Sequence, residues 1–168
     1  MTRWRIELLA KQHDCVPFDC GDNGLNTFLR IYARQNARRN ISRTYVALPE
    51  TEDTVCGFFT LCSGSLSFEA LPEAAARKIP RYPVPIAHIG RLAVAMWRQG
   101  QGLGGLMLTN AMSKIIGVSR IIGIHAVTVR ALDEKAKEFY LSLNFVPLRD
   151  DPLSLYLPIS SISGLASP

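Results

Sequence analysis

Three glycines alternate with other residues in a short segment, 98–104, that leads into an apolar stretch. The segment reads Arg-Gln-Gly-Gln-Gly-Leu-Gly, with glycines at positions 100, 102 and 104. Glycine lets backbone amides approach a ligand closely, and the helix predicted after it offers unpaired amides and the positive end of a dipole. Such a place suits an anionic diphosphate. The glycines alone fit a tight turn or close packing equally well.

Two nucleotide-binding motifs with a similar glycine turn fit this sequence poorly. A dinucleotide-binding turn is followed by an acidic residue about 20 positions later, but here that region holds Arg120 among apolar residues. A P-loop closes on Lys followed by Ser or Thr, whereas this turn continues as Leu103, Gly104 and Gly105. Both motifs are disfavoured, so the residues around the turn have to identify the ligand.

The residues before and within the turn resemble the acetyl-CoA-binding motif of the GNAT acetyltransferases. Residues 89–94 read Ile-Gly-Arg-Leu-Ala-Val, and glycines follow Gln99 at the third and fifth positions after it. The resemblance implies acetyl-CoA as the acetyl donor, with no metal. It implies that the pantetheine arm and thioester lie along the backbone of Leu92, Ala93 and Val94. It also implies that the pyrophosphate is wrapped by Gln99, Gly100, Gln101, Gly102, Leu103, Gly104 and Gly105.

A second segment resembles the tyrosine helix of the same family. Glu138, Phe139 and Tyr140 are followed by Asn144 and Phe145, where the family usually has Gly-Phe; Asn also tolerates left-handed geometry at a helix end. The resemblance implies that Tyr140 donates a proton to the departing CoA thiolate. From the apolar spacing alone, Tyr140 would be an ordinary member of a buried stripe with residues 136, 139 and 143.

Further short segments resemble a narrower group, the GNAT toxins of type II toxin–antitoxin systems. The resemblance extends over residues 18–157 and implies transfer of an acetyl group from acetyl-CoA to the α-amino group of the amino acid on charged tRNA, which blocks translation. It also implies a ribbon-helix-helix antitoxin as partner and a homodimer. The segments that carry it are residues 18–21, 25–29, 43–45, 57–61, 80–85 and 90–94.

Two other functions stay open at this point. The cofactor motif does not specify the acceptor, so a protein or small-molecule amine is one alternative. A regulatory RNA- or protein-binding module with a vestigial cofactor site is a non-enzymatic one. An α-amino group has a pKa of about 8, so acetyl transfer to it needs no strong base. A backbone amide near Ala93 or Val94 would then stabilise the oxyanion.

Basic residues form two groups along the chain, which carries a formal charge of +5. A positive field favours encounter with polyanions, although a solvated charged face is the simpler explanation of the pattern. With the tRNA substrate that the resemblance implies, these residues become candidate phosphate contacts. They are Arg30, Arg34, Arg38, Arg39 and Arg43 in the first group, and Arg77, Lys78 and Arg81 in the second.

The apolar pattern predicts the elements that must position these residues, and together they indicate an α/β (α+β) fold. The GNAT fold has this form, a central mixed, mostly antiparallel sheet flanked by helices. Helical spacing and caps predict helices over residues 24–39, 71–78, 103–116 and from Asp133 to about residue 143. β-branched and aromatic runs predict strands over residues 44–48, 55–63, 86–94, 121–130, 145–148 and 154–157.

The composition is that of an ordinary globular protein. With 168 residues, 48% hydrophobic and 20% charged, we expect a single GNAT domain over residues 1–168, with a loose tail from about residue 160. No stretch approaches the roughly 18 apolar residues of a spanning helix, so we expect a cytoplasmic protein without membrane contact. We assign no role to His88 or His125. The cysteines match no common zinc spacing and are expected to be reduced: Cys15, Cys20, Cys56 and Cys62.

Overall fold

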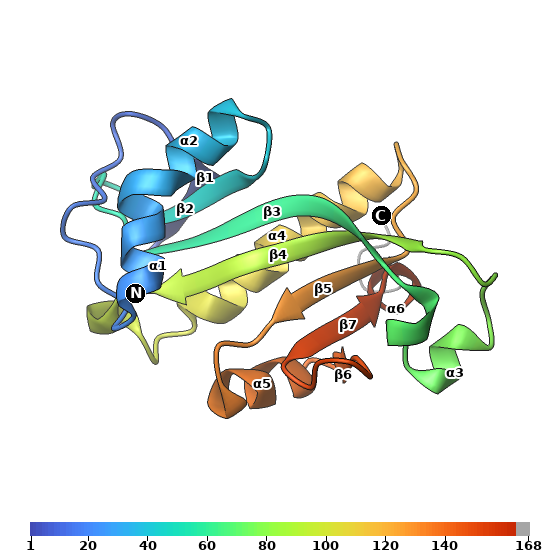
Figure 1. Ribbon diagram of the computed structural model, residues 1–168. Helices are drawn as coiled ribbons and strands as arrows, with labels where there is room; N and C mark the ends of the chain where they lie inside the picture. The colour runs from blue at the N-terminus through green and yellow to red at the C-terminus, as the bar shows by residue number, and fades with distance from the viewer. Residues whose placement is uncertain (164–168) are drawn as a thin grey trace. The chain divides into compact units, whose positions relative to one another are not determined.

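The computed structural model describes residues 1–163, and its strands form one seven-stranded sheet in the order β1-β2-β3-β4-β5-β7-β6 (Figure 1). Strands β4 and β5 run parallel, whereas β1 with β2, β2 with β3, β5 with β7 and β6 with β7 are antiparallel. The predicted mixed, mostly antiparallel sheet is therefore confirmed. None of the helices in this part of the chain is long and apolar enough to cross a membrane.

The chain forms two compact units. The first unit comprises Met1–Cys62 and Gly90–Ala111, and the second comprises Ser63–Ile89 and residue 112 onward. Three elements contribute residues to both units: β3 (Gly57–Leu66), β4 (Val84–Val94) and α4 (Leu103–Ser119).

The first unit contains a continuous helical run that lies against β2 in Figure 1. The run begins at Asp22, whose side chain accepts a hydrogen bond from the Leu25 amide at 2.9 Å, as an N-cap does. Phe28, Leu29 and Ala33 form its buried side. The predicted helix is confirmed, with one turn in π geometry. The elements are α1 (Asn23–Thr27), η1 (Phe28–Tyr32), α2 (Ala33–Arg38), β2 (Arg43–Pro49) and η3 (Met96–Arg98).

An aromatic cluster holds the helical run against the sheet. The ring of Phe28 stacks on Phe58 of β3, with centroids 6.1 Å apart, and Phe18 meets Phe58 edge-on at 5.5 Å. All three rings are buried, and Ala93 of β4 belongs to the same core. These apolar contacts fix the helical run relative to the part of β4 that lies in the first unit.

One strand of the first unit was not predicted. Strand β1 (Trp4–Leu8) pairs antiparallel with β2, in a register that places Trp4 opposite Pro49 and Leu8 opposite Tyr45. Its charged residues hide the strand pattern, but they have partners: Arg5 pairs with Asp53 at 2.9 Å and with Glu7 at 3.1 Å.

The second unit surrounds a core of Leu71, Val84, Ile86, Ala126 and other apolar residues. Its elements are η2 (Phe68–Ala70), α3 (Glu73–Ala76), β5 (Ala126–Arg130), α5 (Glu134–Leu141), β6 (Val146–Pro147), β7 (Ser154–Pro158) and α6 (Ile159–Ser163). The predicted elements occur in the predicted order; α3, α5, β5 and β6 are shorter than the sequence pattern indicates, and η2 and α6 were not predicted.

Two predictions for the second unit were wrong in detail. Residues 121–125 are not part of a strand, because the amides of Ile121 and Ile122 both donate to the Val118 carbonyl and close the end of α4. Residues 159–163 form α6 rather than a loose tail; the rest of the predicted tail, residues 164–168, lies outside the described residues.

Both ends of α5 follow the predicted rules. The side chain of Asp133 accepts a hydrogen bond from the Ala136 amide at 2.8 Å and caps the helix. Beyond its other end, Asn144 has a φ of 72°, so it adopts the left-handed geometry expected of the residue that replaces glycine there.

Candidate active site

The glycine turn connects the end of β4 to the start of α4 in the first unit. Gly100 and Gly102 have φ values of 75° and 81°, which strain any residue with a side chain. The amide of Leu106 donates to the Gly102 carbonyl at 3.1 Å. The amides of residues 102–105 precede that bond and therefore have no partner within the helix. The turn thus presents free donors at the positive end of a 17-residue helix.

The space around the glycines is open. An added Cβ would meet no atom within 4 Å at Gly100, Gly102 or Gly105, and at Gly104 it would reach only the side chains of Val94 and Leu92, at 3.8 and 4.0 Å. Gly100 and Gly102 are therefore favoured by backbone conformation rather than by packing. A diphosphate binds where unpaired backbone amides face open space. The glycine turn therefore fits the pyrophosphate of acetyl-CoA.

A loop from near the N-terminus braces the turn. The side chain amide of Gln99 donates to the Val94 carbonyl at 2.9 Å and to the Cys20 carbonyl at 3.3 Å, while the Met96 amide donates to the Asp19 carbonyl at 2.8 Å. Sequence reasoning noted residues 18–21 only as a point of resemblance and missed this support. The positive φ of Gly21, 89°, is the local signal of a specific turn there.

The other predicted cofactor residues lie together in the first unit. Ala93 and Leu103 are buried, and Leu92 and Val94 are half-buried at the end of β4. Gln101 is exposed, and its side chain donates to the Trp97 carbonyl at 3.3 Å. The turn thus lies between the end of β4 and the start of α4, and apolar residues of both elements pack in or near the core.

Tyr140 lies in the second unit, on α5. It is 7% exposed, whereas Phe139 and Leu143 are 38% and 40% exposed, so the buried stripe that the apolar spacing indicates is not formed, and of these three residues only Tyr140 is buried. Phe139 and Phe145 meet its ring edge-on at 5.3 and 5.7 Å. Burial raises the pKa of the Tyr140 phenol to about 12, because desolvation disfavours the charged form. The hydroxyl therefore stays protonated at neutral pH.

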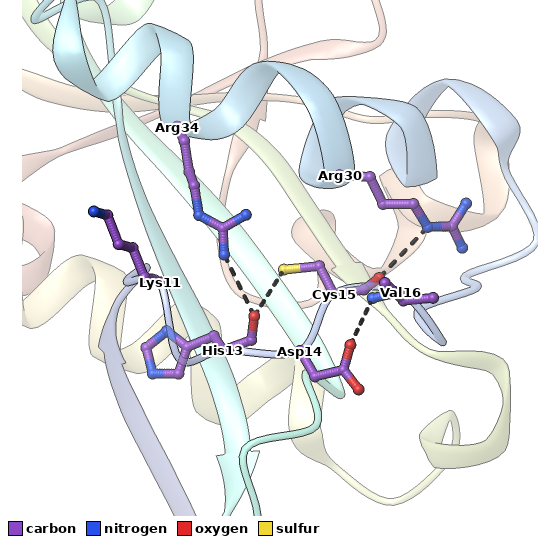
Figure 2. Close-up of a pocket in the computed structure, with 7 residues that line it drawn as sticks. All are labelled: Lys11, His13, Asp14, Cys15, Val16, Arg30 and Arg34. Carbon is purple, nitrogen blue, oxygen red and sulfur yellow. Dashed lines mark hydrogen bonds between the residues drawn. The ribbon is translucent and has the colours of Figure 1, made fainter.

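Two arginines of the first basic group contact a folded loop (Figure 2), although Arg30 is exposed and Arg34 half-buried. Arg34 donates to the carbonyls of Ala10 and His13 at 3.1 and 3.3 Å. Arg30 donates to the carbonyls of Cys15 and Phe18. A purely solvated stripe is therefore wrong for Arg34, because the helix-wheel pattern does not reveal the loop that returns over the helix. Arg30 contacts the same loop and stays exposed.

The remaining basic residues are exposed. Arg43 donates to the Ala37 carbonyl at 3.0 Å and to Asn40 at 2.6 Å. In the second unit, Arg77 pairs with Glu73 at 2.9 Å and Arg81 with Glu69 at 3.8 Å. Within residues 1–163, no ion pair involves the three other exposed members of the two groups, Arg38, Arg39 and Lys78.

The histidines and cysteines have structural surroundings. The buried His13 accepts a hydrogen bond at Nδ1 from the Ala10 amide, so its Nε2 donates to Glu7 at 2.7 Å. His88 contacts Thr128, and His125 contacts Tyr156. The four cysteines are free thiols, and among the described residues no group of histidine, cysteine and carboxylate side chains is arranged to hold a metal ion.

The sequence profile of the acetyltransferase (GNAT) family matches residues 10–145. The chain therefore belongs to the GNAT acetyltransferase family, and the predicted fold class and glycine-turn motif agree with that membership.

More specific similarity extends over nearly the whole chain. A tRNA-acetylating toxin of Mycobacterium tuberculosis (strain ATCC 25618 / H37Rv) is 35% identical over 157 residues, which cover 94% of this chain and 93% of that protein. The structure of AtaT complexed with acetyl-methionyl-tRNAfMet is 36% identical with a TM-score of 0.91, covering 98% of this chain and 100% of that one. A Tyr-to-Phe mutant of the AtaT toxin, bound to the C-terminus of the antitoxin AtaR and acetyl-CoA, is 33% identical with a TM-score of 0.84, covering 98% and 99%.

Gly102→Ala tests whether the backbone of the turn carries acetyl-CoA binding. Alanine disfavours positive φ by about 1–2 kcal/mol, so the empty turn of the variant should relax to another conformation. Restoring the binding conformation should then make acetyl-CoA binding about 5- to 30-fold weaker by calorimetry. The matched control is Gly117→Ala, farther along α4, where an added Cβ also meets no atom. Equal affinities of the two variants would contradict the assignment of the turn.

A second pair of variants tests the loop contacts of the basic helix. Arg34→Ala removes two hydrogen bonds, each worth about 0.5–1.5 kcal/mol, so we expect the free energy of unfolding to fall by about 1–3 kcal/mol. Arg38→Ala removes the same charge from an exposed site and should change it by less than about 0.5 kcal/mol. Urea denaturation at one salt concentration measures both. Equal losses would mean that charge, rather than the loop contacts, determines the effect.

Proposed function

We propose that this GNAT acetyltransferase is a toxin that acetylates the α-amino group of the amino acid on charged tRNA and so blocks translation. The observation with the most weight is similarity over more than nine-tenths of the chain to a tRNA-acetylating toxin and to AtaT complexed with acetyl-methionyl-tRNAfMet. The glycine turn specifies the donor but not the acceptor. The acceptor is therefore argued from the rest of the chain.

Acetyl-CoA supplies the acetyl group as a thioester when it is bound. In this proposal the amides at the start of α4, with Gln99, Gly100 and Gln101 before them, hold its pyrophosphate. The backbone of Leu92, Ala93 and Val94 aligns the pantetheine arm. An amide near Ala93 or Val94 stabilises the oxyanion, because a fixed dipole in a desolvated site costs no reorganisation during the reaction.

Tyr140 is the proposed hydrogen-bond donor to the departing thiolate. With a phenol pKa of about 12 and a thiol pKa of about 8.5, complete proton transfer from Tyr140 would be uphill by roughly 5 kcal/mol. The attacking amine is a much stronger acid once it has formed its bond to the acetyl carbon. We therefore infer that Tyr140 donates a hydrogen bond to the sulfur, while the amine is the net source of the proton.

The exposed basic residues are the proposed tRNA-binding surface. Arg38, Arg39 and Lys78 are the strongest candidates because no carboxylate competes for them within residues 1–163. Arg43, Arg77 and Arg81 are exposed as well. We assign Arg30 and Arg34 chiefly to holding the loop. Each phosphate contact should make tRNA binding more dependent on salt.

The proposal extends to organisation and partners. We infer a single acetyltransferase domain, since the family match runs through both units without interruption. We propose a cytoplasmic location, because charged tRNA is used there. By analogy with AtaT bound to the C-terminus of its antitoxin, we propose an antitoxin of the ribbon-helix-helix class as the partner, and a homodimer as the free toxin.

Labelled acetyl-CoA incubated with a total charged tRNA pool tests the acceptor. We expect label on the aminoacyl group of charged tRNA and none on the same pool after deacylation, because only the charged form carries an α-amine. Mass spectrometry of the released amino acids identifies the species. Label on added proteins or polyamines, with none on charged tRNA, would replace the toxin proposal with another GNAT activity.

Tyr140→Phe tests the proposed donor, because it keeps the ring and removes only the hydroxyl. A hydrogen bond to a charged group contributes about 1.5–3 kcal/mol, so kcat on charged tRNA should fall about 10- to 100-fold with unchanged acetyl-CoA affinity. Because burial raises the pKa of Tyr140 to about 12, its ionisation should not affect the rate between pH 6 and 9. Both enzymes should show parallel rises as the amine deprotonates.

The control for that experiment is Tyr32→Phe, at a tyrosine that is 49% exposed. It should keep the parental rate. A Tyr140→Phe enzyme with near-normal kcat, or one whose pH profile changes shape, would remove the proposed role.

A further inference from the structure

Arg91 is a half-buried cation without a counter-ion. It lies on β4 in the first unit, directly before Leu92, and burial lowers the pKa of its guanidinium. Within residues 1–163 it takes part in no ion pair. Cys62 is the ionisable group that acts on it, but burial raises the pKa of that thiol, so Cys62 is neutral at physiological pH. The charge of Arg91 is therefore uncompensated.

The ring of Phe28 holds this charge in a fixed orientation. The guanidinium carbon of Arg91 lies 3.7 Å from the centre of the Phe28 ring, and the ring itself is 4% exposed and stacked on Phe58. A guanidinium stacked by its face keeps its N–H donors at its edge. A fixed, partly desolvated cation with free donors is a preorganised receptor for an anion.

The strand places this receptor near the expected reaction centre. Successive side chains of a strand point to opposite faces, so Arg91 shares a face with Ala93, whereas Leu92 and Val94 face Gly104 at the start of α4. With a rise of about 3.3 Å per residue, the Cα of Arg91 lies roughly 7–10 Å from those of Ala93 and Val94. An anion bound by Arg91 would thus approach from the side opposite the glycine turn.

A charged tRNA has an anion near its reactive amine, at a separation comparable with these Cα spacings. The phosphodiester before the terminal adenosine is about eight bonds from the α-amino nitrogen, on the order of 10 Å when extended at ordinary bond lengths. We infer that Arg91 binds this phosphodiester and thereby positions the α-amine at the thioester. This inference rests on the proposed function and adds a determinant of acceptor recognition within the catalytic strand.

Two small substrates separate this contact from a structural role. One is a 3′-aminoacyl adenosine without phosphate, and the other is the same aminoacyl group on the dinucleotide CpA, which contains the phosphodiester. We expect the parental enzyme to prefer the dinucleotide by about 10-fold or more in kcat/KM. Arg91→Gln should lose about that factor on the dinucleotide and change less than about 3-fold on the adenosine, because a charge-assisted contact is lost from only one substrate.

Matched variants complete the test. Arg91→Lys keeps the charge without the planar fork and should retain part of the preference for the dinucleotide. This variant also tests the contact if Arg91→Gln folds poorly. Arg120→Gln removes one exposed charge elsewhere and should keep the full preference. Equal losses by Arg91→Gln on both substrates, or no loss on either, would overturn the inference. Absence of parental turnover on both substrates and on charged tRNA would overturn the proposed function itself, and this inference with it.

Discussion

A helix start that binds a diphosphate must leave its own amides unpaired, and this constraint determines much of the first unit. The turn before α4 cannot be stabilised by those amides, so it is held by contacts from outside. The Gln99 side chain donates hydrogen bonds to the carbonyls of Val94, at the end of β4, and of Cys20, and the Met96 amide donates to the Asp19 carbonyl. The positive φ values of Gly100 and Gly102 then direct the amides into open space. Removing the braces would release the donors that the ligand requires.

The aromatic cluster connects this turn to the rest of the first unit. Phe58 on β3 contacts both Phe18, which leads into the bracing loop, and Phe28 on the helical run. Phe28 in turn contacts the guanidinium of Arg91, directly before the strand segment proposed to align the thioester. One buried cluster therefore orients the loop behind the donor site and the cation proposed for the acceptor. A cavity in this cluster would be expected to affect both, since interiors transmit packing changes.

The features that sequence predicted best are those set by local chemistry. The cap at Asp133, the left-handed Asn144 and the glycine turn each depend on a few adjacent residues, and all three have the predicted geometry. Features that depend on distant partners were missed. The charges of β1 hide a strand whose partners lie more than 35 residues away. Arg34, assigned to an exposed face, is half-buried against a loop that the helical pattern does not reveal. One local feature was also missed: Ile121 and Ile122 have the residue types of a strand, although their amides close α4.

The pKa of the attacking amine affects which acceptor can react, even without help from a side chain. At pH 7.4 an α-amine with a pKa near 7.8 is about one-quarter neutral, whereas a lysine amine with a pKa near 10.4 is about one-thousandth neutral. Tyr140 cannot remove this difference, because its phenol pKa of about 12 keeps it protonated. A protonated phenol is suited to donating toward sulfur and cannot also accept the proton of an ammonium group. The same burial that supports Tyr140 as a donor therefore leaves the advantage of an α-amine over lysine in place. An α-amine is the acceptor that charged tRNA provides.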